Sequence, residues 1–296
     1  MYRYEFKEFV HRFGYLTMDR AIERFSIFGG VEGEISLNLS EDIDTIMRGQ
    51  FCKNYHKFRE LIEPSYLLEE PYSRLLRGVS RGDGRLSNIF RRARVGDSLG
   101  RDILEEFSSL DIITFEPSRE APLRKYPAQR LKRHLRSYVI EPKVRFNTPF
   151  LNFWFALVFP FESELERGDF DRFMESFHRD IYILNSFMFE QLSNELLNLY
   201  FGGNLVALGS YWDRNSEFDI LAETIDGVVI VGECKYKNRK VSGNELHKLR
   251  RKIVDSNLKV DKFALFSKSG FSNSLTRLGG RDVILFELKD FKRLIF

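Results

Sequence analysis

Residues 216–237, SEFDILAETIDGVVIVGECKYK, decide the fold, because they form the pattern of two strands joined by a tight turn. The Asp226-Gly227 pair between the two apolar runs is a strong signal for a two-residue β-hairpin turn. The second run begins with four consecutive apolar residues, Val228 to Val231, which indicates a strand buried inside a sheet. We therefore expect a hairpin whose second strand continues into the polar sequence Gly232-Glu233-Cys234-Lys235.

The polar end of this hairpin carries candidate catalytic residues. Side chains alternate along a strand, so Glu233 and Lys235 share one face while Cys234 points to the other, buried face. Asp219 on the partner strand comes close to this pair across the turn. Two carboxylates on paired strands can hold a divalent cation, and a neighbouring ammonium can orient water or stabilise charge. The alternative is a solvated cross-strand ion pair without a chemical role.

The flanking sequence predicts an α/β arrangement. Further extended runs follow the same apolar pattern, and they cover residues 205–211, 262–267 and 283–287. Helical patterns precede and follow the hairpin at about 181–201 and 243–258. From residue 149 onward we therefore expect helices, three strands, a helix, a strand, a helix and a last strand.

The upstream half has a different pattern. Residues 1–70 have helical spacing, with one helix ended by Gly29-Gly30. Between residues 71 and 148, three short helices are expected at 72–79, 86–93 and 98–110, followed by two extended runs around a Pro- and Arg-rich loop. Three helices and a two-stranded wing are typical of a winged-helix domain, although other small helical domains share this count.

Local charge differs strongly from the total. The formal net charge of +3 argues against a globally basic nucleic-acid binder. Basic residues nevertheless gather on the expected wing, at the end of the second of the three expected helices and after Glu233, while residues 162–180 are acidic. The nucleic-acid-binding candidates are Arg91, Arg92, Arg94, Arg124, Lys125, Arg130, Lys132, Arg133, Lys237, Lys240, Lys248 and Arg251. A solvated charged face and phosphate contact explain such clusters about equally well.

Several classes of protein are disfavoured. Two cysteines cannot form a disulfide framework, and five histidines without HExxH spacing make a zinc enzyme unexpected. The N-terminus lacks the apolar core of a signal peptide, and the most apolar run, 149–161, is too short to span a bilayer. We expect no membrane span and a reducing, cytoplasmic location.

The motifs resemble a known superfamily. Asp219 followed by Glu233-Cys234-Lys235, in an α-β-β-β-α-β order, resembles the PD-(D/E)xK nucleases. GSYWDRNSEFDILAE at 209–223 and KFALFSKSGFS at 262–272 further resemble the nuclease-like C-terminal domain of archaeal-type DEXX-box AAA ATPases. IERFSIFGGVEG at 22–33 resembles the helical lid of these ATPases, and residues 137–161 resemble the segment that joins their winged helix to the nuclease-like domain. The P-loop core of that family is absent, so ATPase activity is not expected here.

The resemblance implies a fold class and a set of roles. It implies a lid-like region over 1–70, a winged-helix domain over 71–148, and over 149–296 a restriction-endonuclease-like α/β domain with a mixed central sheet. Asp219 and Glu233 would bind Mg²⁺ or Mn²⁺, with Lys235 as the motif lysine. The preceding helix would add a third metal-binding acid, for which Glu190 is the first choice and Glu195 the alternative. Lys248 resembles the polar residue of the following helix.

Two functions of different classes follow from these patterns. The first is a metal-dependent DNA endonuclease that hydrolyses phosphodiester bonds, with RNA also open as a substrate. The second is a non-catalytic DNA-binding or partner-docking protein that retains the nuclease fold, as loss of the ATPase core would allow. A separate ATPase is a possible partner in either case.

Overall fold

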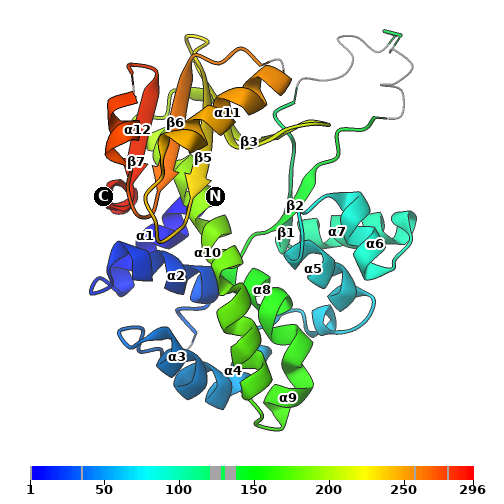
Figure 1. The fold of residues 1–296 in the computed structure, drawn as a ribbon. Coiled ribbons are helices and arrows are strands. Elements are labelled where there is room, and N and C mark those ends of the chain that lie inside the picture. Colours follow the sequence, from blue (N-terminus) through cyan, green and yellow to red (C-terminus); the bar gives the residue numbers. More distant parts are fainter. Residues whose placement is uncertain (1, 35, 121–127, 131–137, 257, 279) are drawn as a thin grey trace. The chain divides into compact units, whose positions relative to one another are not determined.

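The computed structural model describes residues 2–34, 36–120, 128–130, 138–256, 258–278 and 280–296. These residues form two compact units, each described by itself (Figure 1). Unit 1 comprises Met1–Glu116, Pro142–Phe189 and Leu294–Phe296, and unit 2 comprises Pro117–Glu141 and Glu190–Arg293. Residues 149–189 thus pack with the N-terminal part of the chain. This division into two units does not test the three expected domains, whose boundaries at residues 70 and 148 stay predictions.

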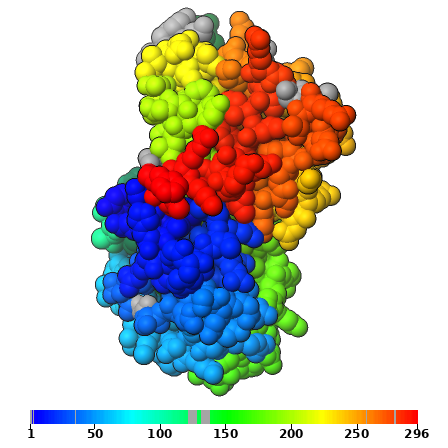
Figure 2. Space-filling view, turned by 90° about the vertical axis from the view of Figure 1, so that its left-hand side faces the viewer, coloured from blue at the N-terminus to red at the C-terminus, as the bar shows by residue number. Residues whose placement is uncertain are grey.

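The N-terminal helices of unit 1 pack through aromatic side chains. The helices of this region are α1 (Arg3–Arg12), α2 (Met18–Phe28), α3 (Ile43–Thr45) and α4 (Tyr55–Glu60), with a π-helix at Ile46–Phe51 and 3₁₀ turns at Cys52–Asn54 and Ser65–Leu68. The ring of Phe25 on α2 lies 5.2 Å from that of Phe6 on α1, edge to face. Helix α2 ends before Gly29, as predicted. The last three residues, Leu294–Phe296, at the red end of the colour bar in Figure 2, belong to the same unit, and the Ile295 carbonyl lies 3.1 Å from the His11 ring of α1.

The three short helices predicted after residue 71 are present. They are α5 (Tyr72–Ser80), α6 (Leu86–Ala93) and α7 (Asp97–Ser109), followed by the antiparallel strands β1 (Ile113–Glu116) and β2 (Lys143–Phe146). Helix α6 buries one face, on which Leu86, Ile89 and Phe90 follow helical spacing. A single bridge joins Arg85, just before α6, to Lys143 of β2.

The most apolar run folds into short helical pieces. They are α8 (Pro149–Phe153), a π-helix at Trp154–Val158, a 3₁₀ turn at Phe159–Phe161 and α9 (Glu162–Glu166). Trp154 is fully buried and stacks on Tyr55 with 5.6 Å between ring centroids, so it belongs to the core. Among the described residues, no helix is both long and apolar enough to cross a bilayer.

Unit 2 is built on a five-stranded mixed sheet. Its strands lie in the order β3 (Leu205–Trp212), β4 (Glu217–Thr224), β5 (Val229–Lys235), β6 (Lys262–Ser267) and β7 (Val283–Glu287). The first three strands are antiparallel, and β5, β6 and β7 are parallel to one another. Helix α11 (Gly243–Ser256) connects β5 to β6, α12 (Asn273–Leu278) connects β6 to β7, and a 3₁₀ segment follows at Leu288–Ile295. The mixed α/β architecture is therefore confirmed.

The hairpin turns at the predicted Asp226-Gly227 pair, but its loop has three residues, 225–227, instead of the expected two, because Glu223 pairs with Val229 and the Thr224 N–H donates to the Val228 carbonyl at 3.1 Å. Gly227 has φ +78°, which glycine adopts without strain, and its N–H donates to the Thr224 carbonyl at 2.9 Å. At Gly232, a Cβ would lie 3.0 Å from the Cβ of Ile220 and 3.3 Å from the Ala264 carbonyl oxygen. Glycine thus permits the close approach of three strands immediately before Glu233.

Different helices cover the two faces of the sheet. Leu246, Leu249 and Ile253 of α11 pack on one face, against a core that includes Val231 and Leu265, and Figure 1 shows α11 lying across the strands. Helix α10 (Asp171–Tyr200) begins ten residues before its predicted start at about residue 181. The C-terminal part of this helix lies on the other face of the sheet. There the Tyr200 ring is 5.2 Å from that of Phe286.

The described ends of the segment between β1 and β2 pack along β3. The Ser118 hydroxyl donates to the Trp212 carbonyl at 2.6 Å and accepts from the Trp212 N–H at 3.1 Å. The indole N–H of Trp212 donates to the Glu141 carbonyl at 3.0 Å. Trp212 is only 2% exposed, so it is a core residue and offers no stacking surface to a base.

Candidate functional site

Asp219 and Glu233 face each other on paired strands. The antiparallel register pairs Ile220 with Gly232, so Asp219 and Glu233 stand one step further along β4 and β5. Opposite residues of an antiparallel pair project from the same face, and here that face is covered by α11. An Oδ2 atom of Asp219 accepts a hydrogen bond from the Cys234 backbone N–H at 2.7 Å. The structure therefore brings these two predicted acids together.

Two lysines hold the Glu233 carboxylate. The Lys235 ammonium forms a short ion pair with Oε1, and the Lys252 ammonium lies 3.3 Å from Oε2. The Glu233 side chain is 12% exposed, so water screens these contacts only partly. Lys252, from α11, also donates to the Glu217 carbonyl at 3.4 Å.

The pKa of Asp219 shows the electrostatic cost of this arrangement. Burial, and then the charge of Glu233, raise the pKa of Asp219 to about 6, against the Cys234 hydrogen bond and the charges of Lys235 and Lys252. Burial lowers the pKa of Lys235, but the carboxylates of Glu233 and Asp219 outweigh it, so that pKa is raised overall. A further positive charge beside Asp219, in addition to those of Lys235 and Lys252, would therefore stabilise the ionised carboxylate.

The other face of β5 holds Cys234, as predicted. Burial raises the pKa of the Cys234 thiol well above its usual value, with further contributions from the charges of Asp219 and Glu190. Its sulfur hydrogen-bonds with Ser193 of α10. Glu190 of α10 therefore lies within electrostatic reach of Cys234, while both Glu190 and Glu195 are partly buried.

The acids fit a magnesium ion only as a pair. Among the described residues, no group of three or more histidines, cysteines or acids is arranged to hold a metal ion. Mg²⁺ is commonly held by one or two carboxylates, with water and substrate phosphate oxygens completing the shell. Asp219 and Glu233 offer such a pair of hard oxygen ligands, and the metal-binding role of Glu190 stays a prediction.

A basic cavity adjoins Lys235. Its volume is about 280 Å³, and it is lined by Lys235, Lys237, Arg239, Lys240, Val241, Ser242, Asn244, Glu245 and Lys248. Lys237 and Lys240 are exposed, as is Arg251 on α11. Lys248, which resembled the functional residue of this helix, bonds Glu245 at 3.1 Å, and Lys252 instead reaches Glu233.

The predicted nucleic-acid residues upstream divide into two groups. Arg91, Arg92 and Arg94 are exposed at the end of α6, and Arg92 lines a cavity of about 460 Å³ together with Arg81 and Arg179. Arg130 is described and exposed. The remaining candidates, Arg124, Lys125, Lys132 and Arg133, lie outside the described residues.

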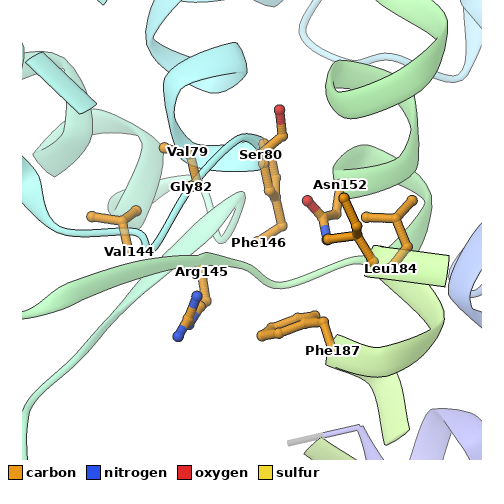
Figure 3. Close-up of a pocket in the computed structure, with 10 residues that line it drawn as sticks. Val79, Ser80, Gly82, Val144, Arg145, Phe146, Asn152, Leu184 and Phe187 are labelled. Carbon is orange, nitrogen blue, oxygen red and sulfur yellow. The ribbon is translucent and has the colours of Figure 1, made fainter. Parts of the chain in front are cut away.

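A second cavity of unit 1, shown in Figure 3, is too small for a substrate. Its volume is about 70 Å³, space for a few water molecules. Its charged lining residue, Arg145, bonds Glu116 at 3.0 Å and lies 5.1 Å from the centre of the Phe187 ring. We assign it no binding role.

Sequence patterns missed the part played by Lys252. It lies within a basic run, Arg250-Arg251-Lys252, in which all three residues have the same charge. Arg250 pairs with Asp282 at 3.0 Å and Arg251 is exposed, so only the rotation of α11 on the sheet selects Lys252. Its position three residues after the buried Leu249 was the available signal.

Comparison with known proteins matches only part of the chain. Residues 154–249 match the family model DUF234, described as archaea bacterial proteins of unknown function. The matched range includes Asp219, Glu233 and Lys235. No curated protein and no solved structure matches the chain.

Proposed function

We propose that the protein is a metal-dependent nuclease that hydrolyses phosphodiester bonds of DNA at Asp219, Glu233 and Lys235. The observation that carries the proposal is the raised pKa of Asp219 beside Glu233 on the paired strands β4 and β5. Two adjacent carboxylates are costly in a partly buried site, and a divalent cation between them removes that cost. The fold and the sequence motif favour this chemistry over a structural ion pair.

The side chains would divide the work of hydrolysis. Asp219 and Glu233 would hold Mg²⁺, which would supply Lewis-acid chemistry by lowering the pKa of a water molecule and offsetting negative charge at the phosphate. Lys235, held in place by Glu233, would orient the attacking water or stabilise negative charge on the phosphate. Water adds to phosphorus and one P–O ester bond breaks, so the products are one phosphate end and one hydroxyl end.

The charge distribution supports a polyanionic substrate. The basic cavity adjoins Lys235 in unit 2, and Arg91, Arg92 and Arg94 are exposed in unit 1. The helix order, the strand pair β1–β2 and the Arg85–Lys143 bridge favour a winged-helix domain. Its third helix, α7, carries Asp97, Asp102, Glu105 and Glu106. We therefore assign phosphate contact to the arginines of α6 rather than to α7.

A cleavage assay tests this function. Supercoiled plasmid, the same plasmid linearised with phosphorylated ends, and a matched RNA are incubated with the protein and Mg²⁺ or Mn²⁺. We expect cleavage by the wild type and its loss in Glu233→Ala and Lys235→Ala, with Glu223→Gln and Lys259→Ala as matched surface controls. Cleavage that persists unchanged in both site variants refutes the assignment, and cleavage of the RNA alone changes the substrate.

One observation favours the non-catalytic alternative. Both oxygens of Glu233 already bind lysines, so Lys235 and Lys252 balance its charge without a metal ion. A scaffold that docks on DNA or on a separate ATPase could retain this arrangement after losing catalysis. Such a protein would bind DNA through the same basic residues but would neither cleave it nor bind a divalent cation through Asp219.

A further inference from the structure

The cavity beside Lys235 has an excess of positive charge. Five of its lining residues are cationic, namely Lys235, Lys237, Arg239, Lys240 and Lys248, whereas Glu245 is its one carboxylate. Burial raises the pKa of Glu245, but the Lys248 hydrogen bond and the charges of Lys235 and Lys237 outweigh it and lower the pKa overall. These cations therefore converge on one small volume.

Three of the cations form no close ion pair with a described residue. Within the described part of the chain, Lys237, Arg239 and Lys240 form no ion pair, whereas Lys248 is bound to Glu245 at 3.1 Å. Cations that face one another without carboxylates repel, and a bound anion relieves this repulsion. The first turn of α11 borders the same cavity, and a helix N-terminus also favours an anion.

The loop that carries these cations is fixed to the core. Val241, 5% exposed, donates from its N–H to the Gly270 carbonyl at 2.9 Å and accepts from the Ser272 N–H at 2.9 Å. The Ser269 hydroxyl donates to the Lys237 carbonyl at 2.7 Å. The backbone of the cavity wall is therefore held by hydrogen bonds before any ligand arrives, which lowers the entropic cost of binding.

We propose that this cavity binds the terminal phosphate of a nucleic-acid strand, so that the enzyme cuts near phosphorylated strand ends. A phosphate monoester carries a charge of about −1.5 to −2 at neutral pH and three acceptor oxygens, which suits several unpaired cations better than a diester does. The cavity volume of about 280 Å³ admits a phosphate with its sugar. Val241 is among its lining residues, so the part of the loop that is hydrogen-bonded to Gly270 and Ser272 forms part of the cavity wall.

Lys235 connects the cavity to the reaction. Its ammonium binds Glu233, and the same side chain lines the cavity. A strand with its end in the cavity would place a neighbouring phosphodiester beside Asp219 and Glu233. This inference rests on the proposed nuclease function, and it specifies the substrate as a strand that ends in a phosphate.

Binding without turnover tests the inference separately from catalysis. Fluorescence anisotropy in EDTA, at fixed salt, compares short single strands that carry a 5′-phosphate, a 3′-phosphate or only hydroxyl ends. The variant is Lys237→Gln/Lys240→Gln, and the matched control is Lys259→Gln/Lys292→Gln, which removes the same charge from exposed positions outside the cavity.

We expect one of the phosphorylated strands to bind the wild type about tenfold more tightly than the hydroxyl strand. The preference should be lost in Lys237→Gln/Lys240→Gln and kept in the control, and the preferred strand identifies the end as 5′ or 3′. Equal affinities for all three strands, or a preference that survives in the cavity variant, overturn the inference. Cleavage of the supercoiled plasmid as fast as of the linear DNA leaves the nuclease function intact while refuting the end-directed substrate.

Discussion

The Lys252 ammonium on α11 lies 3.3 Å from the Glu233 carboxylate on β5. This contact links the helix to the strand that carries the Glu-x-Lys motif, and it supplies Glu233 with a second cation besides Lys235. The lysine stabilises the ionised acids in the absence of metal, and it competes with a metal ion for the same carboxylate. The charge of Lys252 therefore sets how strongly the acid pair attracts a divalent cation.

Replacing Lys252 should strengthen metal binding. In Lys252→Gln the acid pair keeps its oxygens but loses one neighbouring positive charge, so we expect Mn²⁺ to bind about two- to fivefold more tightly. Calorimetric titration at a fixed pH above 7 measures the effect. Lys259→Gln, an exposed lysine in the same unit, should leave the affinity unchanged. Weaker binding in Lys252→Gln would mean that this lysine holds Glu233 in the metal-binding orientation.

The pH dependence of stability should report on Asp219. Its pKa of about 6 in the folded protein exceeds the usual value of 3.8, so the folded state binds the proton more tightly than the unfolded state. This contribution to stability is complete below pH 3.8 and is lost as the pH rises through 6. Asp219→Asn lacks this titrating group, so its stability should not fall in this way as the pH rises. The unfolding free energy of the variant minus that of the wild type should therefore increase by about 1–2 kcal/mol from about pH 5 to about pH 7.5.

Denaturant unfolding in EDTA at the two pH values measures this difference. The control is Glu223→Gln, which removes an exposed carboxylate from the same strand and should show no comparable pH trend. A constant difference between wild type and Asp219→Asn across the range contradicts the raised pKa of Asp219.

Both thiols should be unreactive in the native protein. Burial raises the pKa of Cys52 to about 12, and it raises the pKa of Cys234 well above its usual value. Alkylation requires the thiolate, so we expect native labelling at least about a hundredfold slower than labelling in denaturant. Lys259→Cys introduces an exposed thiol as a positive control. Rapid native labelling of Cys234 would show that the α10 face of β5 is open.

The packing of Ser118 on β3 has its own test. Its hydroxyl accepts from the Trp212 and Glu120 N–H groups and donates to the Trp212 carbonyl, so Ser118→Ala removes three hydrogen bonds. We expect a loss of about 1–2 kcal/mol in stability and faster hydrogen exchange at the Trp212 amide. Ser109→Ala, which removes a hydroxyl from an exposed helix end, should leave that amide unchanged. Unchanged Trp212 exchange in Ser118→Ala means that the segment does not protect β3.

Local sequence signals predicted the hairpin and the acid pair well. The Asp226-Gly227 pair located the turn, but the two-residue loop that it predicts would place Asp219 opposite Cys234, whereas the three-residue loop of the structure places Asp219 opposite Glu233. The alternation also put Cys234 on the buried face. These features depend on residues close together in the chain, which explains why patterns alone revealed them.

Long-range contacts could not be read from the chain. Lys252 reaches Glu233 because of how α11 rotates on the sheet; its spacing from Leu249 places it beside the apolar face of the helix, but that spacing does not identify Glu233 as its partner. The packing of Ser118 beside Trp212 joins residues 94 positions apart, in a segment that the pattern assigned to a wing. Such contacts follow from tertiary packing, which no local motif encodes.

Titrating Mn²⁺ into the wild type and Asp219→Asn by calorimetry, at about pH 8 and so above the Asp219 pKa of about 6, tests most directly whether the acid pair is a metal site. We predict that the wild type binds a divalent cation and that Asp219→Asn weakens binding by about tenfold or more, while Glu223→Gln binds as the wild type does. No detectable binding to the wild type, or equal affinity in Asp219→Asn, would contradict the metal site and favour the non-catalytic scaffold.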